Sequence, residues 1–300
     1  MPIPFCSIVI CTYNREKQLK KCLQSLHNLH YPKEKCEIIV VNDGSTDNTR
    51  YYLSQIKTKR FRVIHHNKNR GISCARNTGI ANTTHNLIAF TDDDCVVDKN
   101  WLSRITKTGR LSQSDIVFGK THYMQKNNTA RFPEKIVSIS RWPGAGNILY
   151  KKEVFEKAGG FDSVFDAYHN EDSEMAIRAV AHDFSFSYEP QALCFHQQSF
   201  WTSKTLFASA KNASVWPILK KKYPNHFTIF SPPILFEKII QPKEYIYLIF
   251  FPILFPILFF RFVYNGKRNM QLFVSKWPIY FLLKRYYIYK EAWKQKIVMW

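Results

Sequence analysis

The sequence predicts an α/β fold in which a mostly parallel central sheet is flanked by helices. Short β-branched runs alternate with helical patterns over the first 90 residues, which is typical of parallel strands joined by helical crossovers. With 300 residues and 45% hydrophobic side chains, the chain can bury a sizeable core. This composition excludes a disordered protein.

The first two strands begin close to the N-terminus. Residues 7–11 form a β-branched run, and apolar residues at helical spacing follow it as far as Leu29. Residues 37–41 form a second apolar run that stops at a turn sequence, and residues 49–56 are suited to a helix. The chain therefore starts with two strand and helix units in succession.

The pattern repeats further along the chain. Residues 61–65 predict a third strand, residues 71–82 a helix, and residues 87–90 a fourth strand. From residue 101 to residue 140 the pattern is less regular. A helix is again predicted at residues 151–158, and another begins at Asn170.

Polar side chains follow three of the predicted strands, namely Thr12, Asp43 and the run Asp92-Asp93-Asp94. Ligands of open α/β sheets bind beyond the carboxyl ends of the strands, so we expect these side chains to meet at one edge. Three adjacent carboxylates repel one another unless a cation such as Mg²⁺ or Mn²⁺ compensates them. A metal site is one interpretation, and an acidic turn is the other.

The last third of the chain is strongly basic and contains a long apolar run. Residues 201–300 hold 16 Lys and Arg and 3 Asp and Glu, a net +13 of the total +20. Residues 245–260 carry no charge, which favours an anionic membrane surface over nucleic acid as the partner. We therefore expect residues 1–205 to form the catalytic domain and residues 206–300 a helical, membrane-associated region.

How residues 245–263 and a second apolar patch at 277–283 meet the membrane stays open. The uncharged run at residues 245–260 would reach only about 24 Å as a helix, and two prolines interrupt it. An interfacial or re-entrant segment, a spanning helix and a buried helix are the three alternatives. No secretory signal precedes the first strand, so the catalytic part is expected at the cytoplasmic face. Seven cysteines without CxxC spacing indicate reduced packing residues.

Six motifs within residues 5–200 together resemble those of family 2 glycosyltransferases. They are SIVICTYNR at 7–15, VVNDGSTD at 40–47, NRG through ARN at 69–77, DDD at 92–94, GGFD at 159–162 and ED at 171–172. The resemblance implies a GT-A fold, a nucleotide-sugar donor, a divalent metal ion (Mn²⁺ or Mg²⁺) and inversion at the anomeric carbon.

The resemblance also implies residues that bind the nucleotide. Asp43 is similar to the family carboxylate that hydrogen-bonds the base, and Thr12 and Tyr13 would line the nucleotide pocket. Arg76 resembles an arginine near the nucleotide that offsets phosphate charge. The alternatives are a simple turn at Asp43 and a solvated helix charge at Arg76.

Metal-binding residues are implied in the same way. Asp92 and Asp94 fit the DxD pattern of the family, with Asp94 a direct metal ligand and Asp92 nearer the ribose or metal-bound water. Asp93 is the other candidate for donor binding. His196 resembles the histidine that completes the metal site in some members, although a histidine after an apolar pair also has structural roles.

Catalytic and acceptor-side residues complete the implied site. Asp172 resembles the base that deprotonates the acceptor hydroxyl, and Glu171 would position the acceptor or orient Asp172. Two acids at a helix N-terminus also complement the helix dipole. The acceptor-side loop of the family resembles a segment of four residues, Gly144, Ala145, Gly146 and Asn147, whose second glycine changes the register.

The expected function is the transfer of one sugar from a nucleotide-diphosphate sugar, with UDP favoured by the resemblance, to a saccharide or lipid-linked acceptor. The Gln-x-x-Arg-Trp signature of processive synthases is absent after His196, which favours a single addition. A metal-dependent nucleotidyltransferase would need a glycine-rich loop near residues 11–14, which is lacking. A non-catalytic binding module is the remaining alternative.

Overall fold

The computed structural model describes residues 2–56, 58, 60–126, 134–140, 143–197, 203–226, 256 and 270–297. The chain divides into two compact units. The first consists of Met1–Asp166 and Glu171–Gln198, and the second of Ala167–Asn170 and Ser199–Trp300. The predicted domain boundary at residues 205 and 206 stays a prediction.

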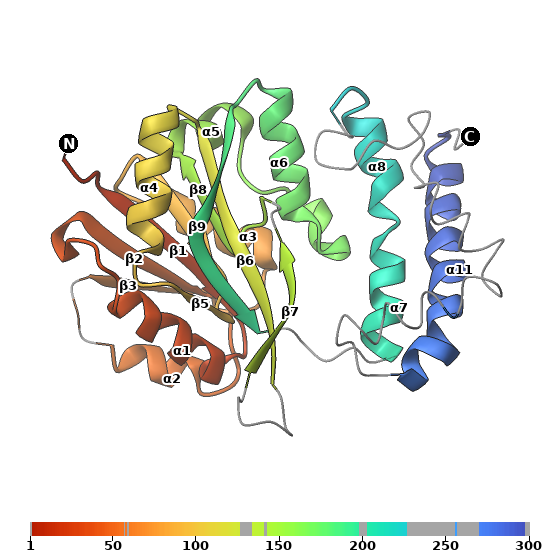
Figure 1. Ribbon diagram of the computed structural model, residues 1–300, viewed down its shortest axis with the longest axis horizontal. Coiled ribbons are helices and arrows are strands. Elements are labelled where there is room, and N and C mark those ends of the chain that lie inside the picture. Colours follow the sequence, from red (N-terminus) through yellow and green to blue (C-terminus); the bar gives the residue numbers. More distant parts are fainter. Residues whose placement is uncertain are drawn as a thin grey trace. The chain divides into compact units, whose positions relative to one another are not determined.

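A nine-stranded sheet forms the centre of the first unit (Figure 1). Its strands are β1 (Cys6–Thr12), β2 (Cys36–Asn42), β3 (Phe61–His65), β4 (Leu87–Thr91), β5 (Cys95–Val97), β6 (Ile116–Lys126), β7 (Glu134–Ser140), β8 (Asn147–Lys151) and β9 (Phe186–Gln197). Their order is β3-β2-β1-β4-β8-β6-β9-β5, and β7 pairs with β6.

The sheet is mixed, whereas the sequence predicted a mostly parallel one. Strands β1 to β4 pair in parallel, but β8 runs antiparallel to both β4 and β6. The parallel pairing of β6 with β9 and the antiparallel pairing of β5 with β9 complete the change of direction. The prediction extended the helical crossovers of the first 90 residues to a later region in which most strand pairs are antiparallel.

Helices cover both faces of this sheet. The helices of the first unit are α1 (Glu16–His27), α2 (Thr49–Ser54), α3 (Ile72–Ala81), α4 (Trp101–Ser112), α5 (Lys152–Ala158) and α6 (Glu171–Ala181), with short 3₁₀ turns at Lys33–Lys35 and Ser163–Tyr168. One apolar core joins α1, α2 and α4 to one face, and a second joins α3, α5 and α6 to the other. The arrangement is a three-layer α/β fold (Figure 1).

Alternation along the strands explains why two cores form. In β1, Cys6, Ile8 and Ile10 face the first core, and Val9 faces the second. All seven β1 residues except Cys11 are buried. A strand that is buried on both faces appears in sequence as a continuous apolar run, which is why residues 7–11 were recognisable.

The second unit contains α7 (Ser203–Asn212), α8 (Val215–Lys222) and α11 (Met270–Lys294). Ala213, Ile288 and Ala292 form a small apolar cluster that joins α11 to the turn between α7 and α8. Apart from Pro256, the predicted membrane segment 245–263 lies outside the described residues. Among the helices that are described, none is both long and apolar enough to span a bilayer.

Candidate functional site

The carboxyl ends of β1, β2 and β4 meet at one edge of the sheet. Thr12 is in register with Asn42 on β2, and Val9 is in register with Phe90 on β4. The loops that follow these strands therefore begin side by side. This placement agrees with the prediction that three groups of side chains converge here, namely Thr12, Asp43 and the run Asp92 to Asp94. Thr12 is buried there, and Tyr13 is largely exposed.

Asp43 holds the loop between β3 and α3. Its Oδ1 accepts the backbone N–H of Arg70 at 2.9 Å and lies 2.6 Å from His66 Nδ1. Its Oδ2 accepts the N–H of Gly71 at 3.0 Å. Gly44 adopts a positive φ of 73° because the backbone of the same loop packs where a Cβ would lie. Asp43 thus orders the loop at this edge of the sheet. Its contact with a nucleotide base stays a prediction.

The aspartate run lies between β4 and β5 and meets a cation from the loop after β1. Arg15 Nη1 lies 2.9 Å from Asp93 Oδ1 and 2.8 Å from Asp94 Oδ2. Burial raises the pKa of Asp93 to about 6, although Arg15 opposes the shift. Burial also raises the pKa of Asp94, and nearby Asp92 adds to the effect. Burial thus makes these carboxyls harder to ionise, while Arg15 favours their charged forms.

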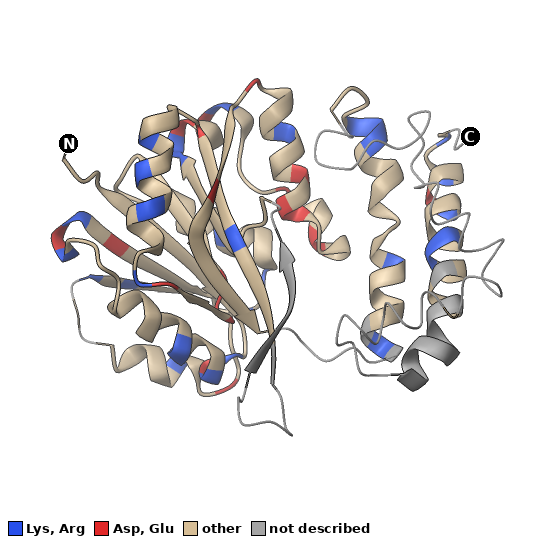
Figure 2. Cartoon of the chain, in the orientation of Figure 1, with Lys and Arg blue, Asp and Glu red and all other residues tan. Residues whose placement is uncertain are grey.

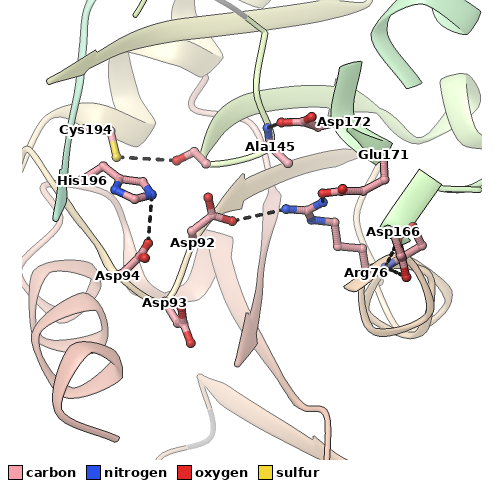
Figure 3. A network of polar contacts seen from close by, with 12 residues as sticks. Arg76, Asp92, Asp93, Asp94, Ala145, Asp166, Glu171, Asp172, Cys194 and His196 are labelled. Carbon is pink, nitrogen blue, oxygen red and sulfur yellow. Dashed lines mark hydrogen bonds and ion pairs between the residues drawn. The ribbon is translucent and has the colours of Figure 1, made fainter. Parts of the chain in front are cut away.

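His196 reaches this cluster from β9, one residue before the strand ends. Its Nε2 lies 3.2 Å from Asp94 Oδ1 (Figure 3). Strand β9 pairs with β5 and β6, which brings His196 into register with Cys95 and Tyr123. The Tyr123 ring lies against the imidazole, with their centroids 5.1 Å apart. Pairing of distant strands thus positions this histidine.

The donor atoms of this cluster fit a divalent cation. Ligand atoms of Asp92, Asp94, Cys95 and His196 all lie within 4.8 Å of one another. Asp94 Oδ1 is buried and accepts no hydrogen bond from the described residues, with His196 Nε2 3.2 Å away, while Arg15 contacts the other carboxylate oxygen. The thiol of Cys95 is held protonated by its neighbour Cys194 and by burial, which raise its pKa. Two carboxylates and an imidazole remain, a ligand set suited to Mn²⁺ or Mg²⁺.

Arg76 on α3 connects the aspartate run to the start of α6. Its Nη1 donates to Glu171 Oε1, and its Nη2 lies 3.4 Å from Asp92 Oδ1 (Figure 3). The guanidinium also packs over the Phe161 ring, with its Cζ 5.2 Å from the centroid. Both Arg76 and Glu171 are buried, so the alternative of a solvated helix charge is wrong. Whether Arg76 contacts a donor phosphate stays a prediction.

Asp172 is placed at the N-terminus of α6, next to Glu171. Its Oδ1 accepts the N–H of Ser173 at 2.7 Å, and its Oδ2 lies 3.4 Å from the N–H of Ala145 (Figure 3). Burial and the Glu171 carboxylate raise the pKa of Asp172 to about 6, against the attraction of Arg76. A carboxylate with this pKa is ionised near neutral pH and can still accept a proton, as a general base must.

The segment Gly144 to Asn147 leads into β8 beside these acids. Gly146 lies against Asp92, whose Oδ2 would be 2.7 Å from a Cβ at this position. Asn147 is buried, with its amide bonded to Trp101 Nε1 at 2.7 Å and to the Ala192 carbonyl at 3.0 Å. Gly146 and Ala145 therefore border the site, whereas the Asn147 side chain supports the fold. Their contact with an acceptor stays a prediction.

Several residues that shape the site were not predicted. Asn14, at φ 54°, accepts the N–H of Thr46 at 2.7 Å and so joins the loops after β1 and β2. Asp166 accepts from the backbone and hydroxyl of Ser73 at the start of α3 (Figure 3). A cation directly after β1 could have pointed to Arg15. Asp166 gave no such signal, because its partner lies 93 residues away in the chain.

Comparison with known proteins identifies a family. The model of the glycosyl transferase family 2 matches residues 7–174. Glycosyltransferase AglE of Haloferax volcanii is 33% identical over 171 residues, which is 53% of this chain and 56% of that protein. The poly-β-1,6-N-acetyl-D-glucosamine synthase of Staphylococcus epidermidis is 26% identical over 242 residues, which is 72% of this chain and 58% of that protein. The chain thus spans little more than half the length of either relative.

Solved structures show the same fold. A mannosyltransferase from Pyrobaculum calidifontis, in complex with GDP-Man and Mn²⁺, aligns with a TM-score of 0.62 at 16% identity, covering 97% of this chain and 88% of that one. S. aureus TarS in complex with UDP-GlcNAc aligns with a TM-score of 0.55 at 19% identity, covering 76% and 73%. At these identities the likeness supports the GT-A type of α/β fold and nothing finer.

Proposed function

Since the chain belongs to glycosyl transferase family 2, we propose that it transfers a single sugar, with inversion, from a nucleotide-diphosphate sugar to an acceptor hydroxyl. One observation carries the proposal. A carboxylate with a raised pKa, Asp172, and a cluster of possible metal ligands around Asp94 are connected through Arg76 and Glu171. A base on one side and a diphosphate site on the other is what inverting transfer requires.

The reaction assigns one task to each side of the site. The acceptor oxygen forms a bond to the anomeric carbon while the bond from that carbon to the diphosphate oxygen breaks. Asp172 Oδ2 or Oδ1 takes the proton that the acceptor hydroxyl loses. The nucleoside diphosphate leaves with the bonding electron pair, so charge and atoms balance. Attack and departure on opposite sides of the carbon produce inversion.

Asp92, Asp94 and His196 would hold the divalent cation. When bound, such an ion neutralises the charge that develops on the departing diphosphate. Arg15 has a supporting role, because it fixes Asp94 Oδ2 and leaves Oδ1 directed toward His196. Arg76 holds Asp92 from the other side, so two arginines orient the cluster, one from the loop after β1 and one from α3.

The substrate classes follow from the relatives by analogy. The neighbours with bound UDP-GlcNAc and GDP-Man support a nucleotide-sugar donor. We favour a UDP-sugar, with a saccharide or lipid-linked acceptor in surface polysaccharide or glycolipid assembly. One relative is named as a polymer synthase, whereas the absent Gln-x-x-Arg-Trp signature supports a single addition here. A position at the cytoplasmic face of a membrane is part of this proposal.

The test is release of nucleoside diphosphate from UDP-, GDP- and dTDP-sugars, with membrane extract as acceptor and with Mn²⁺ or EDTA. We expect release with one donor class, at least a hundredfold lower in EDTA or after Asp94→Ala, because leaving-group charge is no longer compensated. Glu156→Ala is the control, since this exposed acid on α5 takes part in none of the contacts described for the site.

Other outcomes would redirect the proposal. Turnover that is unaffected by EDTA and by Asp94→Ala would remove the metal from it. Donor binding without turnover, measured by calorimetry on folded protein, would favour a non-catalytic binding module. Products that carry a ladder of added sugars, seen by mass spectrometry, would replace single addition by polymerisation.

A further inference from the structure

Helix α11 carries a stripe of exposed apolar and aromatic side chains. They recur at alternating intervals of three and four residues, which places them on one face of a helix: Ile279, Leu282, Tyr286, Tyr289 and Trp293. Leu282 is 60% exposed, Tyr286 55% and Trp293 87%. These five residues, called the α11 stripe below, extend over 15 residues, a rise of about 21 Å along the helix.

The stripe is not the face by which α11 packs in its own unit. That face carries Ile288 and Ala292, which are buried against Ala213, and Arg285, which is also buried. On a helical projection these residues lie roughly 100–160° from Tyr286. The packing of α11 on its neighbours in the second unit therefore leaves the stripe outward, where large apolar side chains in such number indicate a partner.

Charge beside the stripe indicates what that partner is. Helix α11 has five basic residues and one acid, Glu291. Lys290 and Lys294 border the stripe, and both are exposed. Lys290 Nζ lies 5.6 Å from the centroid of the Tyr286 ring. Glu291 is largely buried, accepts from Gln295 Nε2 and lies 3.9 Å from Lys294 Nζ, so it offsets the charge of Lys294 in part while that ammonium stays largely exposed. The outward face therefore combines apolar side chains with lysines, and Figure 2 shows in blue the basic residues of the described part of α11.

We propose that the α11 stripe lies in the interface of an anionic lipid bilayer, with the helix parallel to the membrane plane. Tyrosine and tryptophan side chains favour the headgroup level, and Leu282 and Ile279 would reach the acyl boundary. Lysines beside an apolar face can extend toward lipid phosphates. A second copy of the chain is a poorer partner, because it would present the same positive charge.

The sequence of the same unit supports this partner independently. Residues 245–260 carry no charge, and residues 201–300 have a net charge of +13. An apolar run and a basic excess in one region are the combination that binds anionic membranes. The proposal does not depend on the transferase activity, and its test uses no donor.

The test is co-sedimentation of the full chain with vesicles of neutral phosphatidylcholine, or of the same lipid with 30% phosphatidylglycerol. We expect the double variant Leu282→Asp, Trp293→Asp to bind the anionic vesicles at least tenfold more weakly than the original chain. The matched control is Tyr51→Asp with Leu111→Asp, two residues that are 71% and 62% exposed in the other unit. This control should bind unchanged.

A charge test separates lipid phosphate from apolar attraction. Two substitutions that reverse the charge beside the stripe, Lys290→Glu and Lys294→Glu, should weaken binding to the anionic vesicles about tenfold. They should leave binding to neutral vesicles nearly unchanged. Reversal of two exposed lysines in the first unit, by Lys33→Glu and Lys107→Glu, is the control of equal net charge.

Three results would overturn the proposal. One is the absence of vesicle binding by the original chain. A second is equal binding by the stripe variants and the original chain, which would assign membrane attachment to other residues such as 245–260. The third is a dimer in solution, seen by analytical ultracentrifugation, that the stripe variants abolish, which would make a second copy the partner.

Discussion

Asp172→Asn is expected to reduce kcat for sugar transfer about 10² to 10⁴ fold with little change in donor affinity. The amide keeps the size of the carboxyl and can still accept the N–H of Ser173, but it cannot take a proton from the acceptor. The measurement is steady-state transfer together with donor binding by calorimetry. A kcat within threefold of the original would mean that Asp172 is not the base.

The pH dependence of kcat should reflect the ionisation of Asp172. Because the pKa of Asp172 is raised to about 6, the ionised base predominates above pH 6, and kcat should fall about tenfold per pH unit well below it. This acid limb should be absent from the residual activity of Asp172→Asn. A limb that persists in the variant would belong to another group.

Stability provides a control for misfolding of this variant. A carboxyl whose pKa is higher in the folded state begins to destabilise the fold as pH rises through the unfolded value. The penalty is complete above the folded value and absent below both. Asp172→Asn should therefore be more stable than the original by about 1–3 kcal/mol at pH 7.5, and similar at pH 3.5. Urea denaturation at the two pH values measures the difference. An inactive but more stable variant would separate chemistry from folding.

Arg76→Met is expected to destabilise the protein by about 3–5 kcal/mol, the second large effect. Methionine preserves much of the buried volume, but Glu171 loses its partner and remains a buried charge. Loss of the contact with Asp92 should be minor by comparison, since Asp92 is partly exposed. Urea denaturation at pH 7.5 measures the change in the free energy of unfolding.

The double variant Arg76→Met, Glu171→Gln tests the cause. If an uncompensated charge is responsible, the second substitution should restore at least half of the lost stability. Arg104→Met is a comparison, because Arg104 lies 3.7 Å from a partly exposed Asp98 and should cost no more than about 1 kcal/mol. Additive losses in the double variant would show that the arginine acts by packing alone.

The N-terminal half of the fold could be predicted because its signals are local. Strand β1 was expected at 7–11 and extends over Cys6–Thr12, while β3 has the predicted bounds. Residues 101–140 appeared irregular, yet they contain α4 and two strands. The direction of β8 also escaped prediction, because antiparallel pairing with β4 depends on a partner about 60 residues away. Local patterns show strands but not their partners.

The residues of the site also divide into those with a local sequence signal and those without one. The acids were found because they stand in short motifs after strands or at a helix start. Arg15, Tyr123 and Asp166 were missed because their importance depends on contacts that the chain makes only when folded. The sequence named His196 as a candidate metal ligand, and the structure places it within β9, 3.2 Å from Asp94. The substrate roles of all these site residues remain predictions, but the structure shows which of their side chains can act together.

The hydrogen bonds of Asp43 have a consequence for ligand affinity. The loop between β3 and α3 has no regular secondary structure, yet one carboxylate accepts N–H groups from both Arg70 and Gly71. Fixing the backbone of a residue costs about 1–2 kcal/mol in conformational entropy. Here that entropy is lost during folding, so a nucleotide that reaches this edge meets a loop already in place. Its binding free energy is not reduced by ordering the loop.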